Sequence, residues 1–168
     1  MTPKPKEIIF LVLLIIGLVL SLVYVAKADE IDDLVPHIIQ VESSGNPHAV
    51  SREGCVGLMQ ISSLVFKEWL NNCETKDFLY RNTHIYYMLD EILMHPDKNK
   101  KIGTWYLHRI KDHYLKENYT IERMLAAYNG GPSRMRKLLR EGKDWQDMPR
   151  ESVDYVKKIM RLYKVEKL

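Results

Sequence analysis

The hydrophobic positions divide the chain into an apolar leader and a longer part with helical periodicity. Residues 8–26 form a nearly continuous apolar run of 19 residues, preceded by Lys4 and Lys6. From residue 29 onward, apolar residues recur at intervals of three and four, which is typical of amphipathic helices. This spacing predicts helices over 32–42, 62–71, 76–95, 103–116, 121–128, 133–142 and 150–164. We therefore expect one domain that is all-α or nearly so, with at most a small hairpin within residues 46–60.

Local signals set the expected helix ends. Asp32, Thr120 and Ser133 are candidate N-caps, because their side-chain oxygens can accept a bond from the first free N–H groups of a helix. Gly45 is expected to end the first helix. Pro96 is expected to follow the end of the 76–95 helix.

The leader has two readings. Its apolar run is long enough to span a bilayer, and the leading lysines predict a cytoplasmic N-terminus. The sequence Ala26-Lys27-Ala28 also fits a signal-peptidase site, although the run is longer than a usual signal core, which favours a retained anchor. In either case residues 1–28 serve as a signal-anchor or signal peptide, and residues 29–168 form an exported domain, long enough for a real core.

The most informative polar residue is Glu42, which shares a helical stripe with Val35, Ile38 and Ile39. Burial on that stripe would disfavour the ionised carboxylate and raise its pKa. A carboxylic acid that stays protonated near neutral pH can protonate a glycosidic oxygen. The alternative is a helix-end glutamate held by a salt bridge or by backbone donors.

Four motifs in register surround this glutamate. Together they cover roughly residues 31–160 and resemble those of soluble lytic transglycosylases, the lysozyme-like enzymes that cut peptidoglycan. The motifs are Glu42-Ser43-x-Gly45-Asn46-Pro47-x-Ala49-x-Ser51 with Gly54-x-x-Gly57-Leu58-Met59-Gln60-Ile61; Asn99-x-x-x-Gly103-x-x-Tyr106-Leu107; Ala126-Ala127-Tyr128-Asn129-Gly130-Gly131-Pro132; and Pro149-x-Glu151-Ser152-x-x-Tyr155-Val156.

The resemblance implies a lysozyme-like fold and a single-acid mechanism. Glu42 would protonate the oxygen between N-acetylmuramic acid and N-acetylglucosamine and then act as base on the sugar's own 6-hydroxyl. The product is a 1,6-anhydro ring, formed with help from the substrate's acetamido group and without a second protein carboxylate. No cofactor is implied.

The resemblance also supplies candidate substrate-binding residues. Ser51 and Gln60 would bind the muramyl sugar or its acetamido group. One of Tyr128 and Asn129 would orient the acid while the other contacts substrate. For two further tyrosines, binding to sugar and packing below the site are equally open: Tyr106 and Tyr155.

Two departures from the family pattern stand out. Cys55 occupies a position where the family commonly has alanine. The chain between Gln60 and Asn99 is longer than in compact members, so residues 79–95 are expected to form an added helix. In an oxidising compartment Cys55 and Cys73 could form a disulfide, although Cys55 also fits as a small buried hydrophobic residue.

The distribution of charge and the spacing of the histidines bear on three further functions: binding to an anionic polymer, to nucleic acid and to metal. Residues 29–99 carry 5 basic and 12 acidic groups, and residues 100–168 carry 17 and 9. The basic half would suit an anionic polymer such as cell wall, or would simply be a solvated helix surface. There is no nucleic-acid-binding signature. The six histidines form no metal-ligand pattern, so no metal site is expected.

Two competing functions remain open. A lysozyme-type hydrolase would need a second carboxylate, for which Glu53, Glu151 and Asp154 are the candidates. A weakly active module that binds wall for a secretion or conjugation apparatus is the other. All three readings place the domain in the bacterial cell envelope, outside the cytoplasmic membrane, either anchored through residues 8–26 or released by cleavage after Ala28.

Overall fold

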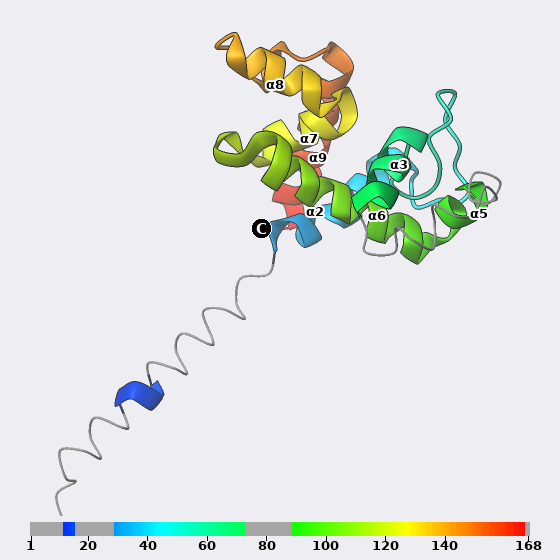
Figure 1. Ribbon diagram of the computed structural model, residues 1–168, viewed down its shortest axis with the longest axis horizontal. Helices are drawn as coiled ribbons and strands as arrows, with labels where there is room; N and C mark the ends of the chain where they lie inside the picture. The colour runs from blue at the N-terminus through cyan, green and yellow to red at the C-terminus, as the bar shows by residue number, and fades with distance from the viewer. Residues whose placement is uncertain (1–11, 16–28, 73–88, 167–168) are drawn as a thin grey trace, which may run out of the picture.

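The computed structural model describes residues 12–15, 29–72 and 89–166 of the chain (Figure 1). From residue 29 these ranges are built from helices joined by loops, and they contain no β-strand beyond two isolated bridges, Val50–Val56 and Val56–Ile61. The all-α prediction is therefore confirmed. The elements are α2 (Glu30–Glu42), α3 (Ser63–Asn72), α5 (Leu89–Met94), α6 (Pro96–Arg109), the π-helix η2 (Ile110–Leu115), the 3-10 helix η3 (Lys116–Asn118), α7 (Ile121–Gly130), α8 (Pro132–Arg140), the 3-10 helix η4 (Trp145–Asp147) and α9 (Arg150–Glu166).

Several predictions fall outside these ranges. They concern Cys73, most of the 76–95 helix, and the apolar run 8–26 apart from residues 12–15. None of the helices in the described ranges combines the length and the hydrophobicity needed to cross a bilayer. The membrane anchor, the division at residue 28 and the disulfide therefore stay predictions.

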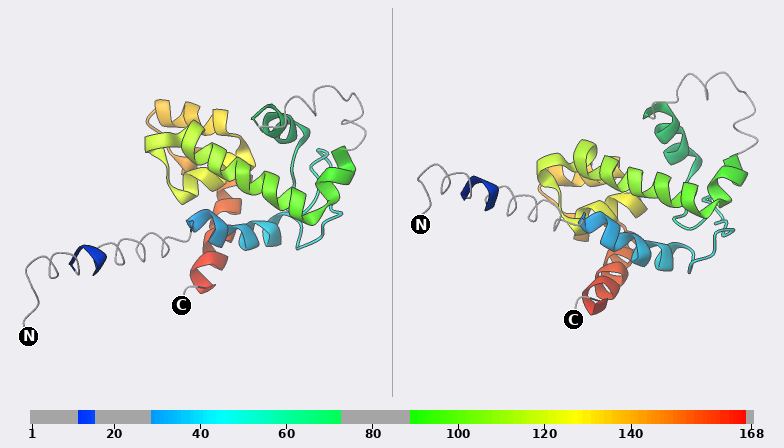
Figure 2. Two further views of the ribbon diagram at one scale, coloured as in Figure 1. Left: turned by 60° about the horizontal axis from the view of Figure 1, so that its bottom comes forward. Right: turned by 90° about the horizontal axis from the view of Figure 1, so that it is seen from below.

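Helix α7 lies at the centre of the domain, where it packs against α8, α9 and η2 (Figures 1 and 2). Its core-facing residues include Ala126 and Ala127, which are fully buried and small enough to let neighbouring helices approach closely. Helix α2 packs against α9 on one side and α6 on another. This arrangement brings the end of α2 and the middle of α9 together, although they lie more than a hundred residues apart.

Three predicted helix starts are wrong. The cap of α2 is Asp29, whose side chain accepts from the Ile31 N–H at 3.2 Å, so Asp32 lies inside the helix. Gly131 precedes α8 and Pro132 occupies its first turn, which displaces Ser133 from the cap position. Helix α6 begins at Pro96 rather than at residue 103, since proline is well suited to the first turn of a helix. The Thr120 cap is confirmed by its bond from the Arg123 N–H.

A long loop between α2 and α3 is fastened to the helices by Asn99. This fully buried side chain accepts from the Met59 N–H at 2.8 Å and donates to the carbonyls of Val56 (2.8 Å) and Leu93 (2.7 Å). Gly57 lies against it with a φ of +82°, and a Cβ at that position would meet the Asn99 amide. The loop is therefore held in one conformation by α6.

Candidate active site

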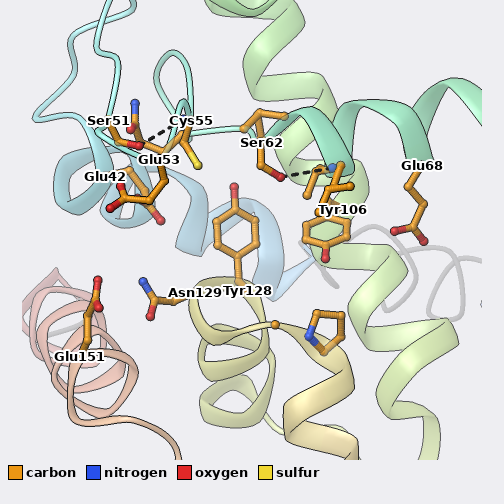
Figure 3. A pocket seen from close by; sticks show the side chains of 16 residues that line it. Glu42, Ser51, Glu53, Cys55, Ser62, Glu68, Tyr106, Tyr128, Asn129 and Glu151 are labelled. Atoms are coloured by element: carbon orange, nitrogen blue, oxygen red, sulfur yellow. Dashed lines mark hydrogen bonds between the residues drawn. The ribbon is translucent and has the colours of Figure 1, made fainter.

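A cleft of about 690 Å³ runs between the α2–α3 loop with α3 on one side and helices α7 to α9 on the other (Figure 3). Glu42 and Glu53 lie at one end of this cleft and Glu68 at the other. Six of the seven predicted site residues line it, Tyr155 being the exception, so the fold brings the motifs together. The lining residues are Glu42, Ser51, Glu53, Cys55, Gln60, Ile61, Ser62, Leu64, Val65, Glu68, Tyr106, Tyr128, Asn129, Gly131, Pro132 and Glu151.

Glu42 is the last residue of α2, and its side chain is mostly buried at the edge of the cleft. Burial raises the pKa of Glu42 from 4.5 to about 7. A hydrogen bond to Oε1 from the Tyr155 hydroxyl, 2.7 Å long, favours the carboxylate and opposes the rise. The negative charge of Glu151 adds to the rise. Near neutral pH the protonated and ionised forms of Glu42 are both well populated.

Tyr155 reaches Glu42 from α9 and is buried beneath it, outside the cleft lining. Burial and the nearby Glu42 raise the pKa of Tyr155 well above its usual range, so the phenol stays neutral and acts as a donor. Tyr155 thus packs below the cleft and contacts Glu42, while its role, like that of Glu42, stays a prediction.

Tyr128 and Tyr106 form the floor of the cleft. The Tyr128 hydroxyl donates to the carbonyl of Met59 at 2.7 Å, and its ring lies 5.8 Å from that of Tyr106. Burial raises the pKa of both phenols. The hydrogen bond that orients Glu42 thus comes from Tyr155, while Tyr128 fastens the loop.

The other predicted residues are polar groups already fixed by the protein. Ser51 Oγ accepts from the Cys55 N–H at 3.1 Å, which leaves its hydroxyl hydrogen for another acceptor. Gln60, with a φ of +49°, donates from Nε2 to the carbonyls of Ala49 and Gly57. Asn129 Oδ1 accepts from Ser152 at 2.8 Å, and its amide nitrogen is directed towards Glu42 (Figure 3).

Sequence reasoning did not find the wall formed by α3. Leu64, 76% exposed, lines the cleft together with Val65 and Glu68. Glu68 is tied to the opposite elements, since it accepts from Arg109 Nε at 3.0 Å and from the Tyr114 hydroxyl at 2.8 Å. No motif marked these residues, because their spacing is that of any amphipathic helix.

The three candidates for a second carboxylate differ in whether they line the cleft. Glu53 and Glu151 line the cleft near Glu42, whereas Asp154 is absent from the lining and pairs with Arg150 at 3.6 Å. Within the described ranges, no group of three His, Cys, Asp or Glu residues is placed to hold a metal ion. Around the mostly buried Glu42 the cleft therefore offers two exposed carboxylates, Glu53 and Glu151, while Glu68 lies at its far end.

A helical domain that presents one buried carboxylic acid at a helix end beside a cleft has a lysozyme-like architecture. Comparison with family models gives the particular group: residues 25–148 match the transglycosylase SLT domain. The chain belongs to this family. The match contains Glu42 and the five predicted substrate-binding residues that line the cleft, and it ends before Glu151 and Tyr155.

Two similar proteins share a name. The membrane-bound lytic murein transglycosylase C of Pectobacterium atrosepticum is 32% identical over 117 residues, which cover 67% of this chain and 30% of that protein. Its counterpart from Photorhabdus laumondii is 33% identical over 104 residues, covering 60% of this chain and 27% of that protein. The chain thus spans about 30% of the length of these relatives.

Proposed function

We propose that this protein is a peptidoglycan lytic transglycosylase in which Glu42 serves as the single acid and base. The observation that carries the proposal is the pKa of Glu42, about 7, in a side chain that lines the cleft and is held by Tyr155. A group that first gives and then takes a proton works best when its pKa lies near the working pH. Family membership and the names of the relatives support the same activity.

The first step needs protonated Glu42. Its Oε1 accepts from Tyr155, so Oε2 is the oxygen that would carry the proton to the glycosidic oxygen between N-acetylmuramic acid and N-acetylglucosamine. As the bond from C1 to that oxygen breaks, N-acetylglucosamine leaves with the proton. Positive charge then develops at C1 of the muramyl sugar, where the substrate's own acetamido oxygen is suited to stabilise it.

The second step returns the proton. The ionised Glu42 removes the hydrogen of the muramyl 6-hydroxyl while that oxygen bonds to C1, which closes the 1,6-anhydro ring. No water is consumed, and Glu42 ends the cycle protonated. Ser51, Gln60 and Asn129 would hold the muramyl sugar from the loop and α7, with the rings of Tyr106 and Tyr128 beneath it.

The proposal also includes a location. Residues 8–26 would anchor the chain in the cytoplasmic membrane with residues 29–168 on the outer side, in reach of peptidoglycan. The names of the relatives, which call those proteins membrane-bound, agree with attachment to a membrane.

Mass spectrometry of the products tests this function. Purified peptidoglycan is treated with the full chain and with Glu42→Gln, and Glu53→Gln serves as a control that removes a carboxylate from the same cleft. Anhydromuramyl products from the wild type and the control, and none from Glu42→Gln, are expected. Substantial cleavage by Glu42→Gln would refute the single-acid mechanism.

Hydrolysis of the same bond is the second candidate, because Glu53 and Glu151 line the cleft beside Glu42. Either carboxylate could activate a water on the sugar if the separation is suitable. Hydrolysed products are one water heavier than anhydro products, so the same spectra distinguish the two reactions. A hydrolase would also lose activity in Glu53→Gln or Glu151→Gln.

A further inference from the structure

The outer face of α9 is a cationic stripe. Its inner face buries Tyr155, Val156 and Ile159 against α2 and α7. On the opposite side, four exposed basic residues occupy positions i, i+1, i+4 and i+7, which one helix face brings together. These residues, which we call the α9 stripe, are Lys157, Lys158, Arg161 and Lys164.

Among the residues that the structure describes, the charges of the α9 stripe have no acidic partner. Within the described part of the chain, none of its four residues forms an ion pair, whereas Arg150 at the start of the same helix pairs with Asp154. The one carboxylate in the last three turns, Glu166, is held by His37 at 2.7 Å. Val165, 68% exposed, adds an apolar side chain on this face.

The stripe lies near the place where the chain enters the domain. His37 of α2 contacts both Glu166 and the ring of Tyr163, so the end of α9 is fastened to the first half of α2. Figure 2 shows the last turns of α9 on the same side of the domain as the start of α2. Two carboxylates near this place already have partners. Asp29 contacts His108 and Lys111, and Glu30 accepts a hydrogen bond from Tyr119.

We propose that the α9 stripe docks on the anionic phospholipid surface of the membrane in which residues 8–26 are anchored. This inference rests on the proposed anchor and is independent of the proposed chemistry. The anchor would bring the start of α2, and with it the end of α9, close to the lipid headgroups. Each Lys or Arg near an anionic bilayer strengthens binding by about fivefold, and Val165 can enter the interfacial layer. Docking would fix the orientation of the cleft relative to the membrane.

Lysine labelling tests the docking on the wild-type full chain. The protein is reconstituted into neutral phosphatidylcholine vesicles and into vesicles that contain phosphatidylglycerol, and acetylation rates are read by mass spectrometry. Lys157, Lys158 and Lys164 should react about fivefold or more slowly in the anionic vesicles. The exposed Lys100 and Lys101 of α6 serve as internal controls and should not change. Salt at about 1 M, where the screening length is about 3 Å, should remove the protection.

Paired variants make the test specific. Lys157→Gln combined with Lys164→Gln should abolish the protection of Lys158, whereas Arg134→Gln combined with Arg140→Gln, an equal charge change on exposed positions of α8, should preserve it. Equal labelling in neutral and anionic vesicles would overturn the proposal. Protection that appears only when insoluble peptidoglycan is added would also overturn it and assign the stripe to the wall. Cleavage of soluble glycan strands, measured in parallel, reports separately on the proposed enzyme activity.

Discussion

Replacing Glu42 with glutamine is expected to stabilise the folded domain, but only at neutral and alkaline pH. The pKa of Glu42 is raised from 4.5 to about 7 by burial, so the folded state disfavours the carboxylate. Below pH 4.5 the Glu42 side chain is protonated in both the folded and unfolded states, so it does not change the free energy of unfolding. As the pH rises to about 7 and above, Glu42 ionises freely in the unfolded chain, whereas its ionisation in the folded chain is unfavourable, and the folded state is destabilised. At about 1.4 kcal/mol per pKa unit, this difference amounts to about 3 kcal/mol.

The free energy of unfolding, measured with urea at pH 4 and pH 8, checks this prediction. Glu42→Gln should exceed the wild type by up to about 3 kcal/mol at pH 8 and by almost nothing at pH 4. The glutamine carbonyl can still accept from Tyr155, so that bond is retained. Glu53→Gln removes an equal charge from an exposed position and should show no such pH dependence. An equal stability difference at both pH values, or a loss of stability at pH 8, would refute the reasoning.

Three further substitutions have expected outcomes. Tyr155→Phe removes the hydrogen bond that favours the carboxylate of the proposed acid, so the pH above which cleavage declines should rise by about one unit. Tyr119→Phe is the control: it removes a similar bond outside the cleft and should leave that pH unchanged. Glu151→Gln removes a charge that raises the same pKa and should shift the decline to lower pH; an upward shift would contradict the electrostatic account. Asn99→Ala breaks three buried hydrogen bonds and should lower the free energy of unfolding, measured with urea, by about 3 kcal/mol or more. A loss below about 1 kcal/mol would show that other contacts hold the α2–α3 loop.

The sequence was sufficient where local pattern decides structure. The stripe that predicted a buried Glu42 is present, with Val35 and Ile38 buried and Ile39 partly buried. The turn after Glu42 and the cap at Thr120 also followed from residues a few positions apart. Periodicity and turn chemistry depend on near neighbours, so a single sequence carries them.

Three predicted helix starts were wrong, and the reason is physical. Asp29 and Asp32 are equally able to cap α2, and the choice depends on which turn packs against the rest of the domain. The contact between Tyr119 and Glu30 lies in that first turn, and nothing in the local sequence predicts it. The same applies to α6, whose start at Pro96 lies beside the Asn99 network.

Long-range hydrogen bonds were the features that sequence reasoning could not assign. The last motif contained Tyr155, but spacing alone could not distinguish a residue that binds sugar from one that lies 113 positions from Glu42 and donates to it. Asn99 opened the second motif without any indication that its partners would be backbone atoms of the loop. Such roles depend on which elements the tertiary fold brings together.

The cleft is consequently positioned by groups that need never touch a sugar. Met59 shows this most clearly, because its N–H is held by Asn99 of α6 and its carbonyl by Tyr128 of α7. The neighbouring Gln60 thereby lines the same cleft as Glu42, to which Tyr155 of α9 donates. A buried acid with a raised pKa destabilises the fold, and three helices that converge on the loop and on Glu42 oppose that cost with fully satisfied buried bonds. Catalytic competence in this domain should therefore depend as strongly on α6 and α9 as on the residues that line the cleft.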